Sequence, residues 1–355
     1  MTNKRIVFTG GGSAGHVTPN MAIINELGTE WDVSYIGSKA GIEKELIEKM
    51  AIPYFGIHSG KLRRYFDLEN VSDLFKVLKG CFEARRILKK LKPAVVFSKG
   101  GFVTVPVVIA AKSLGIPVYI HESDITPGLA NKIAQRFSTR IFTSFEEAKQ
   151  YFPGKKTKVT GSPIRKALLL GSAAKGREVL GFREQLPMIT IMGGSLGAKK
   201  INEAVRKSLP QMTAHFQVVH LCGKNQLDPQ YSNYPRYRQF EYVHDELADI
   251  LAATDLVVTR GGSNAIFEFL ALKIPMIIIP LGRDQSRGDQ ILNAKSFQDK
   301  GYSVTLEEND LNHETLMKTI ERVYKDKAKF QSKMRDASNK DALQVIIQEL
   351  NQIKG

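Results

Sequence analysis

The sequence predicts an α/β protein with two domains, each built on a parallel sheet. Its 355 residues exceed what one typical hydrophobic core holds. Short apolar runs alternate with helix-like patterns along the chain, as they do where helices connect parallel strands. A strand, a glycine-rich turn and a helix start occupy residues 5–15, and the same succession recurs at 188–198. We therefore expect two Rossmann-like domains that face a central cleft, where the carboxyl ends of the strands converge.

The apolar runs place the strands of the first half near 5–9, 33–37, 94–98, 117–120 and 139–143. Those of the second half lie near 188–192, 217–221, 255–259 and 275–279. The Thr-Gly-Ser-Pro segment at 160–163 is a natural hinge, and a second crossing is expected after about residue 325. We expect an N-terminal domain over 1–161, a C-terminal domain over 162–335, and an amphipathic helix within 336–355 that packs back on the N-terminal domain.

The composition indicates a globular protein with an anionic partner. Its hydrophobic content of 43% is ordinary, but its formal net charge of +15 is not. Such an excess favours nucleic acid, an anionic membrane surface or a phosphorylated substrate. Cys81 and Cys222 lie far apart without metal-ligand spacing, which suits a reducing compartment. Met1 leads straight into a strand and no apolar run reaches the ~18 residues that span a bilayer, so we expect no signal peptide and only peripheral membrane contact.

Basic and apolar side chains are interleaved over residues 61–92. This stretch holds ten Lys or Arg against four acids, together with Leu74, Phe75, Val77, Leu78 and Phe82. A helix of this composition is typical of a membrane surface. It equally fits a helix that packs its apolar side on its own sheet and leaves its lysines in water. Both interpretations remain open on the sequence.

The segment 256–272 is the most informative of the chain. A strand, a turn containing Gly261 and Gly262, and a helix start follow one another, which presents free backbone N–H groups to a phosphate. Glu268, on the first turns of that helix, can hold a ribose diol, and Arg260 can balance a diphosphate. A sugar nucleotide would satisfy both features.

The first glycine turn satisfies the G-x-G-x-x-G pattern of dinucleotide sites with Gly10, Gly12 and Gly15. The strand near 33–37 nevertheless ends in Gly-Ser-Lys, without the acid that binds the ribose of NAD. A phosphate or sugar loop with His16 at the helix start, or a turn for tight strand–helix packing, remains.

A second glycine turn at 98–104 contains Gly100 and Gly101. The two turns should lie side by side and suit a diphosphate. Lys99 adds a charge there, although a surface lysine is the commoner explanation.

Polar residues follow three further strands. The run His121–Asp124 can supply a general base or form a hydrogen-bonded loop, and its spacing does not suit a metal. Asn131 lies at the next helix start. In the second half, the Gly-Gly-Ser turn ending at Ser195 offers donors to a phosphate, with Asn202 to brace it. Asp289 and Gln290 can bind sugar hydroxyls.

Six motifs in this order resemble the MurG family of peptidoglycan N-acetylglucosaminyltransferases. They are Gly-Gly-Gly-Ser-Ala-Gly-His at 10–16, Ser-Lys-Gly-Gly-Phe at 98–102, His-Glu-Ser-Asp at 121–124, Gly-Gly-Ser-Leu-Gly-Ala at 193–198, Arg-Gly-Gly-Ser-Asn at 260–264 with Glu268, and Asp-Gln-Ile-Leu-Asn-Ala at 289–294. Each motif alone is weak, but their order and spacing are specific. The resemblance implies a GT-B fold and an inverting transfer of GlcNAc from UDP-GlcNAc to the 4-hydroxyl of the muramyl residue of lipid I, which makes lipid II.

The resemblance also implies residue roles in donor binding. Glu268 would bind the ribose, the backbone at Val243 the uracil, and Arg165 would lie near the donor. Phosphate would be bound by Ser195, Ser263, Asn264 and Ala265, and GlcNAc by Asp289 and Gln290. With Arg260, these residues form the expected donor site.

The acceptor diphosphate would be cradled by the N-terminal turns. The expected residues are Gly11, Gly12, Ser13, Gly15, Gly100, Gly101 and Asn131. His16 would be nearest to a catalytic base. Many members carry His-Glu-Gln-Asn where this chain has His121–Asp124, so a carboxylate replaces an amide. We expect Asp124 to share or take the base role, with Glu122 as a further catalytic candidate.

An inverting transfer needs a base and stabilisation of the departing UDP. Helix N-termini and arginine should supply the latter, and we expect no essential metal and no cofactor. The expected partners are UDP-GlcNAc, lipid I and the anionic cytoplasmic face of the membrane through 61–92. Another UDP-sugar transferase acting on a glycolipid and a UDP-GlcNAc epimerase are the alternatives. No recognised nucleic-acid motif is present, so we expect no nucleic-acid partner.

Overall fold

The chain forms two compact units. The computed structural model describes residues 3–60, 69–194, 197–282, 286–337 and 341–353, without the side chains of 69–72 and 74. Unit 1 comprises Met1–Arg165 and Lys340–Gly355, and unit 2 comprises Lys166–Asn339. Each crossing lies four residues beyond the boundary expected from the sequence, at 165 against 161 and at 339 against 335.

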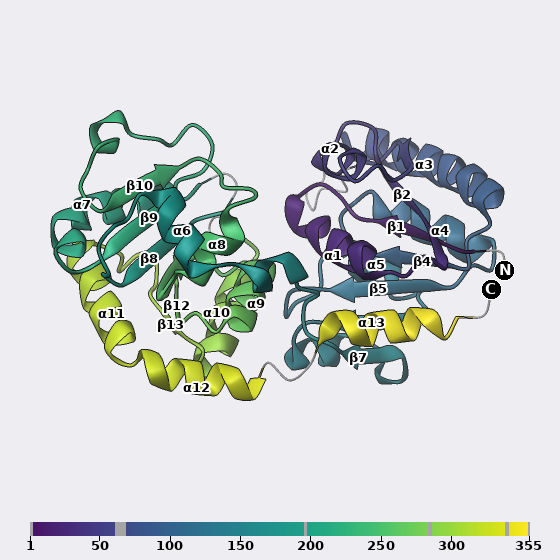
Figure 1. Cartoon of the computed structure of the whole chain (residues 1–355). Helices are drawn as coiled ribbons and strands as arrows, with labels where there is room; N and C mark the ends of the chain where they lie inside the picture. Colours follow the sequence, from purple (N-terminus) through teal and green to yellow (C-terminus); the bar gives the residue numbers. More distant parts are fainter. Residues whose placement is uncertain (1–2, 61–68, 195–196, 283–285, 338–340, 354–355) are drawn as a thin grey trace. The chain divides into compact units, whose positions relative to one another are not determined.

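Unit 1 is a seven-stranded sheet in the order β3-β2-β1-β4-β5-β6-β7, and every neighbouring pair is parallel (Figure 1). Its strands are β1 (Lys4–Thr9), β2 (Trp31–Ser38), β3 (Tyr54–Ile57), β4 (Val95–Ser98), β5 (Val118–Glu122), β6 (Arg140–Thr143) and β7 (Thr157–Val159). Its helices are α1 (Thr18–Glu26), α2 (Ile42–Glu48), α3 (Glu69–Leu91), α4 (Thr104–Ser113), α5 (Leu129–Ala134) and α13 (Ala342–Asn351), with 3-10 turns η1 (Ala14–His16), η2 (Glu146–Tyr151) and η3 (Gly154–Lys156).

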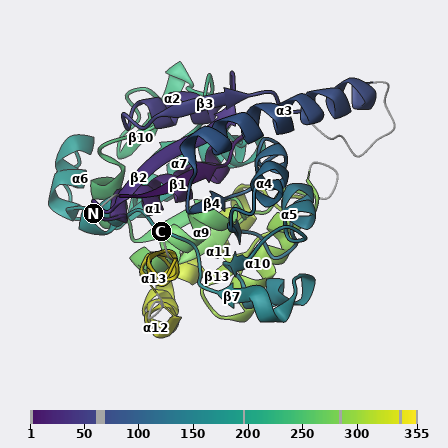
Figure 2. The same cartoon turned by 90° about the vertical axis from the view of Figure 1, so that its right-hand side faces the viewer.

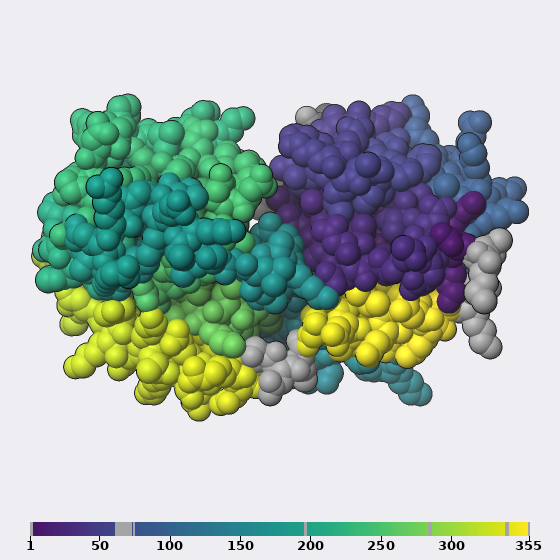
Figure 3. Space-filling view, viewed as in Figure 1, coloured from purple at the N-terminus to yellow at the C-terminus, as the bar shows by residue number. Residues whose placement is uncertain are grey.

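The sheet of unit 1 separates two apolar cores because successive strand side chains point to opposite faces. Val7 and Val96 pack with α3 and α4 on one face. Ile6 and Phe8 pack with α1, α2 and α13 on the other. The C-terminal helix is thus part of unit 1, and Figure 3 shows it in yellow along the purple N-terminal segments. Trp31 Nε1 donates to Asn351 Oδ1 at 2.9 Å, which fixes its last turn.

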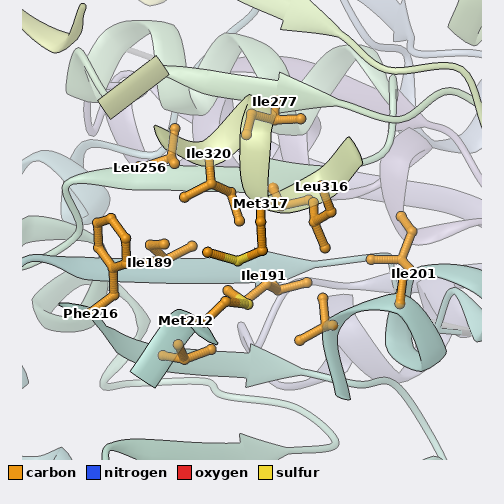
Figure 4. Close-up of a cluster of buried hydrophobic side chains, with 14 of the residues drawn as sticks. Ile189, Ile191, Ile201, Met212, Phe216, Leu256, Ile277, Leu316, Met317 and Ile320 are labelled. Atoms are coloured by element: carbon orange, nitrogen blue, oxygen red, sulfur yellow. The ribbon is translucent and has the colours of Figure 1, made fainter. Parts of the chain in front are cut away.

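Unit 2 is a six-stranded sheet in the order β10-β9-β8-β11-β12-β13, again parallel throughout. Its strands are β8 (Met188–Met192), β9 (Gln217–Leu221), β10 (Tyr237–Phe240), β11 (Leu256–Thr259), β12 (Met276–Ile278) and β13 (Ser303–Thr305). Its helices are α6 (Ala173–Leu180), α7 (Lys199–His215), α8 (Leu247–Ala252), α9 (Ser263–Leu272), α10 (Asp289–Asp299), α11 (His313–Lys325) and α12 (Lys327–Ala337), with 3-10 turns η4 (Lys166–Leu170) and η5 (Pro229–Tyr231). Figure 4 shows strand side chains such as Ile189 and Ile191 packed against Met212 of α7 and Leu316 of α11.

The expected fold class is confirmed, and four strands had not been predicted. They are β3, β7, β10 and β13, which are the outer strands of the two sheets. Only one residue in each of β3, β10 and β13, and none in β7, is fully buried. Edge strands therefore lack the continuous apolar run that identified the central ones.

Helix α3 has two apolar faces. Ala84 and Leu88 are buried in the core of unit 1, whereas Phe75, Leu78 and Phe82 are exposed. Figure 2 shows the helix extending past its neighbour α4. Within the described part of the chain, no helix combines the length and apolar character needed to cross a bilayer.

Candidate functional site

The two glycine turns of unit 1 lie side by side, as the sequence predicted. They follow β1 and β4, which pair in register up to Thr9 and Ser98. Gly11 N–H donates to Gly100 O at 3.3 Å. A Cβ on Gly101 would lie 2.2 Å from Gly11 O, and its φ of 93° also favours glycine. For the N–H groups of Gly100 and Gly101, the described residues provide no acceptor.

A buried carboxylate occupies the first turn. Glu43 of α2 is fully buried and accepts hydrogen bonds from Gly12 N at 3.2 Å, Ser38 N at 3.0 Å and Ser38 Oγ at 2.5 Å. A Cβ on Gly11 would lie 2.4 Å from Glu43 Oε1. The N–H of Gly12, expected to bind the acceptor phosphate, is therefore already satisfied within the protein. Glu43, the second residue of α2, was not recognised from the sequence as a partner of the first glycine turn.

His16 lies in η1 with a defined ring orientation. Its Nδ1 lies 3.0 Å from Gly11 O and 3.2 Å from Ser13 Oγ. A carbonyl oxygen only accepts, so the neutral ring carries its proton on Nδ1 and its lone pair on Nε2. A Cβ on Gly100 would lie 3.5 Å from both His16 Cδ2 and Asn131 Nδ2. The ring therefore borders the second glycine turn. Its basic nitrogen is Nε2, whereas the nitrogen that contacts Gly11 O is Nδ1.

Lys99 is buried, so the expectation of a surface lysine is wrong. It is 2% exposed, and its Nζ lies 2.8 Å from His121 Nδ1 and contacts Ser123 Oγ. Burial lowers the pKa of Lys99 to about 8, although the negative charges of Glu122 and Asp124 act to raise it.

His121 is held neutral by the same contacts. Its Nε2 donates to Gly161 O at 3.1 Å, which leaves Nδ1 to accept from Lys99. Burial and the Lys99 charge place the pKa of His121 well below its ordinary value. Because its lone pair is engaged by an ammonium group, His121 is not placed to act as a base.

Glu122 organises its own loop. Its Oε1 accepts from Asp124 N at 3.0 Å, and its Oε2 accepts from Gly128 N at 3.1 Å and Asn131 Nδ2 at 2.9 Å. Burial, and the nearby Asp124, raise the pKa of Glu122. A buried carboxylate with three such donors holds the loop in shape, which is a structural use of a residue expected to be catalytic. Within the described residues, Asn131 Oδ1 is buried without a donor.

Two helix N-termini adjoin each other in unit 2. Helix α9 begins at Ser263 and α10 at Asp289. Asn293 Nδ2 donates to Gly261 O at 3.1 Å, and a Cβ on Gly261 would lie 2.5 Å from Gln290 O. Since each helix start presents backbone N–H groups and a partial positive charge, the pair favours an anion.

A third strand–turn–helix segment joins β8 to α7. Gly194 and Gly197 have positive φ values of 101° and 76°. A Cβ on Gly197 would lie 2.3 Å from Cys222 O, and Asn202 Nδ2 holds that carbonyl at 3.0 Å. Asn202 therefore braces the turn through the end of β9. Ser195 lies outside the described residues.

Arg260 has a partner inside the protein. It is 8% exposed, its Nη1 donates to Ile279 O at 3.1 Å, and its Nη2 lies 2.5 Å from Glu308 Oε1. Burial disfavours the carboxylate of Glu308, but the hydrogen bonds from Arg260 and Lys200 outweigh it and lower its pKa. The charge of Arg260, expected to balance a diphosphate, is therefore matched by Glu308.

The remaining expected donor residues flank the paired helix starts. Asn264 and Glu268 lie one turn apart on the same face of α9 and, like Ala265, are half-buried. At α10, Asp289 Oδ2 accepts from Arg287 at 2.9 Å and Gln290 Oε1 from Leu281 N at 3.1 Å.

In the sequence, Val243 and Arg165 are distant from the starts of α9 and α10. Val243 lines a hollow of about 380 Å³ in which the rings of Tyr242 and His244 stack at 6.5 Å. Such a hollow suits a flat ring. Arg165 is the last residue of the first segment of unit 1.

Comparisons with known proteins agree with this arrangement. Residues 6–143 match the model of the glycosyltransferase family 28 N-terminal domain, and 188–350 match that of its C-terminal domain. A UDP-N-acetylglucosamine–N-acetylmuramyl-(pentapeptide) pyrophosphoryl-undecaprenol N-acetylglucosamine transferase of Bacillus cereus is 57% identical over 98% of this chain and 99% of its own. A transferase of the same name from Shouchella clausii is 56% identical over the same shares.

The chain belongs to the MurG family. The crystal structure of Acinetobacter baumannii MurG matches 98% of this chain and 99% of its own, with a TM-score of 0.78 at 26% identity. The UDP-GlcNAc 2-epimerase of Methanocaldococcus jannaschii, at 17% identity and a TM-score of 0.65 over 98% of this chain and 99% of its own, shares the fold alone.

A buried polar chain in this MurG-family protein was not recognised from the sequence. His220 Nε2 lies 2.9 Å from Asn202 Oδ1, and Nδ1 lies 2.9 Å from the hydroxyl of Tyr237. The amide oxygen only accepts, so the proton is on Nε2 and the tyrosine donates to Nδ1. Burial, with the charge of Arg206, lowers the pKa of His220 to about 3.

This shift predicts acid sensitivity of unit 2. Unfolded His220 takes up a proton near pH 6.5, whereas the folded protein excludes it until about pH 3. The stabilisation is complete above pH 6.5 and is lost as the pH falls, by about 1.4 kcal/mol per unit. The wild type should lose unfolding free energy when the pH is lowered from 7.5 to 5.5. In His220→Gln this loss should be smaller by about 1 kcal/mol, because the histidine that takes up the proton is absent.

Urea unfolding at the two pH values measures this difference. The exposed His313 on α11 provides the control, and His313→Gln should leave the pH dependence as in the wild type. An unchanged pH dependence in His220→Gln would show that the proton uptake belongs elsewhere.

Proposed function

We propose that the chain transfers GlcNAc from UDP-GlcNAc to the 4-hydroxyl of the muramyl residue of lipid I, with inversion, and so produces lipid II. The observation that carries this proposal is near full-length identity of 56–57% with transferases named for this donor and acceptor. The glycine turns of unit 1 and the helix starts of unit 2 would supply the anion sites that two diphosphate substrates require. An epimerase needs no second substrate site, and its similarity is confined to the fold.

The donor is assigned to unit 2. The adjoining starts of α9 and α10 would face the diphosphate, and the backbone N–H groups would stabilise the charge that develops on the departing UDP. Glu268, five residues beyond the first residue of α9, would accept the ribose hydroxyls. The hollow at Val243 would take the uracil. Asp289 and Gln290, at the start of α10, would bind the sugar.

The acceptor is assigned to unit 1. The N–H groups of Gly100 and Gly101 replace that of Gly12 as the proposed diphosphate donors, because Glu43 engages Gly12. Asn131 Oδ1 would accept from a hydroxyl of the acceptor. His16 would take the proton of the attacking hydroxyl, because its Nδ1 contact leaves the lone pair on Nε2. Asp124 is the second candidate for that proton.

The donor assignment is tested through Glu268. Hydrogen bonds to a carboxylate contribute about 1.5–3 kcal/mol, so Glu268→Ala should raise the KM for UDP-GlcNAc roughly 10- to 100-fold. The assay follows radiolabelled GlcNAc passing from UDP-GlcNAc to a lipid I analogue. Glu203, exposed on α7, gives a matched control in Glu203→Ala, which should keep the wild-type KM. A wild-type chain without transfer would refute the function, and an unchanged KM in Glu268→Ala would refute the ribose assignment.

We further propose that α3 binds the anionic cytoplasmic surface of the membrane. Phe75 and Phe82 are 68% and 75% exposed, and lysines such as Lys79 lie between them on the outward side. The opposite face of the helix packs in the core of unit 1. The packing interpretation of the sequence therefore describes that face, and the membrane interpretation is proposed for the exposed face. A basic helix with exposed rings binds by inserting them below anionic headgroups.

Vesicle sedimentation tests this surface. The double variant Phe75→Ala/Phe82→Ala should lower the partition coefficient on phosphatidylglycerol-containing vesicles at least about tenfold, because two rings proposed to insert into the membrane are lost. Leu227, 49% exposed in unit 2, provides the control variant Leu227→Ala, with no expected change. Equal binding by the double variant would refute the surface.

A further inference from the structure

One peptide group of the first glycine turn lies between a buried carboxylate and His16. The N–H of Gly12 donates to Glu43 Oε2 at 3.2 Å, and the carbonyl oxygen of Gly11 lies 3.0 Å from His16 Nδ1. Both groups belong to the peptide that joins Gly11 to Gly12, and in a trans peptide they point in opposite directions. Glu43 and His16 are therefore linked through a single peptide plane.

The chain itself does little to fix the orientation of this peptide. It joins two glycines, and Gly12 has a φ of 82°, in a region that glycine enters as readily as the negative one. Glu43 is much better anchored. It is fully buried, and its Oε1 accepts from the backbone N–H of Ser38 at 3.0 Å and from its hydroxyl at 2.5 Å. The carboxylate thus selects the orientation in which the N–H of Gly12 points toward it.

That orientation decides which ring nitrogen of His16 carries the proton. Two groups lie near Nδ1, the carbonyl of Gly11 at 3.0 Å and the hydroxyl of Ser13 at 3.2 Å. The hydroxyl can donate or accept, but the carbonyl only accepts, so it places the proton on Nδ1. If the peptide turned, the hydroxyl of Ser13 could donate to Nδ1, and the proton would move to Nε2. Nε2 could then no longer accept a proton.

We propose that Glu43 is a positioning residue for His16, which acts by holding the peptide between Gly11 and Gly12 so that its carbonyl accepts from His16 Nδ1. Successive hydrogen bonds polarise one another, so the bond to Glu43 also makes the Gly11 carbonyl a stronger acceptor. The effect on activity rests on the proposed role of His16 as the base, whereas the effect on the tautomer does not. Glu43 does not touch the reacting atoms in this account.

Nitrogen-15 NMR of the histidine-labelled chain tests the tautomer, because the two ring nitrogens resonate differently when protonated. The wild type should carry the His16 proton on Nδ1. A glutamine side chain accepts through only one of its two end atoms, so Glu43→Gln loses its bond to Gly12 or its anchor at Ser38. The form protonated on Nε2 should then become the major one. The kcat for transfer to a lipid I analogue should fall roughly 10- to 100-fold, with an unchanged KM for UDP-GlcNAc.

A double-mutant cycle separates this role from a general effect on the shape of the turn. Residues that act as one group give losses that do not multiply. Adding Glu43→Gln to His16→Ala should therefore lower kcat little further. Losses that multiply would overturn the proposal, because Glu43 would then act on the acceptor independently of His16.

Glu45, exposed on the same helix, gives the matched control Glu45→Gln, which should change neither the tautomer nor kcat. If Glu43→Gln does not fold, Glu43→Asp replaces it in both measurements. The aspartate keeps a carboxylate in the site but draws it back by about 1.5 Å, so the same change of tautomer is expected.

A wild-type His16 protonated on Nε2, or a folded Glu43 variant with the wild-type tautomer, would overturn the proposal. A wild-type chain with the expected tautomer that transfers no GlcNAc would instead refute the proposed function. The tautomer measurement still decides the role of Glu43 in that case, since it needs no turnover.

Discussion

The close backbone contact between the two glycine turns of unit 1 is the constraint on which the proposed acceptor site depends. Strands β1 and β4 are parallel neighbours, so their turns leave the same edge of the sheet. Only glycine lets the chain at Gly101 approach Gly11 O, since a Cβ would lie 2.2 Å from that oxygen. This approach brings His16 and Asn131 together beside Gly100, each 3.5 Å from its Cβ position. The geometry of the proposed base and of the anion donors is thus a property of backbone packing.

Buried charges hold the loops around this edge. Glu43 binds the first turn and Glu122 binds the loop after β5. Lys99, which directly follows β4, contacts His121 at the end of β5. In unit 2 the Arg260–Glu308 pair has the same role beside α9. Each buried ion has a partner within the protein, as the high cost of isolated buried charge requires. Charge at a strand end is therefore used for internal pairing at these positions and does not by itself identify a ligand contact.

The sequence was sufficient for features that depend on local pattern. Central strands were found because both of their faces are buried, and the adjacency of the glycine turns followed from the order of parallel strands. The outer strands, such as β7, have no such pattern because solvent reaches them. Partners far apart in sequence were also out of reach. The pairing of Arg260 with Glu308, and of Gly12 with Glu43, depends on tertiary contacts that no motif encodes.

The central claim is that the glycine turns of unit 1 serve the acceptor while the helix starts of unit 2 serve the donor. The most direct test measures Gly101→Ala by calorimetric titration with UDP-GlcNAc and by transfer to a lipid I analogue. Gly115, with a φ of 72° and open space around its Cβ position, supplies the control Gly115→Ala, which imposes backbone strain without the contact. The account predicts that Gly101→Ala lowers kcat/KM for the acceptor about 100-fold and leaves the Kd for UDP-GlcNAc unchanged, while Gly115→Ala keeps both. Near wild-type transfer by Gly101→Ala, or an equal loss of UDP-GlcNAc binding, would contradict it.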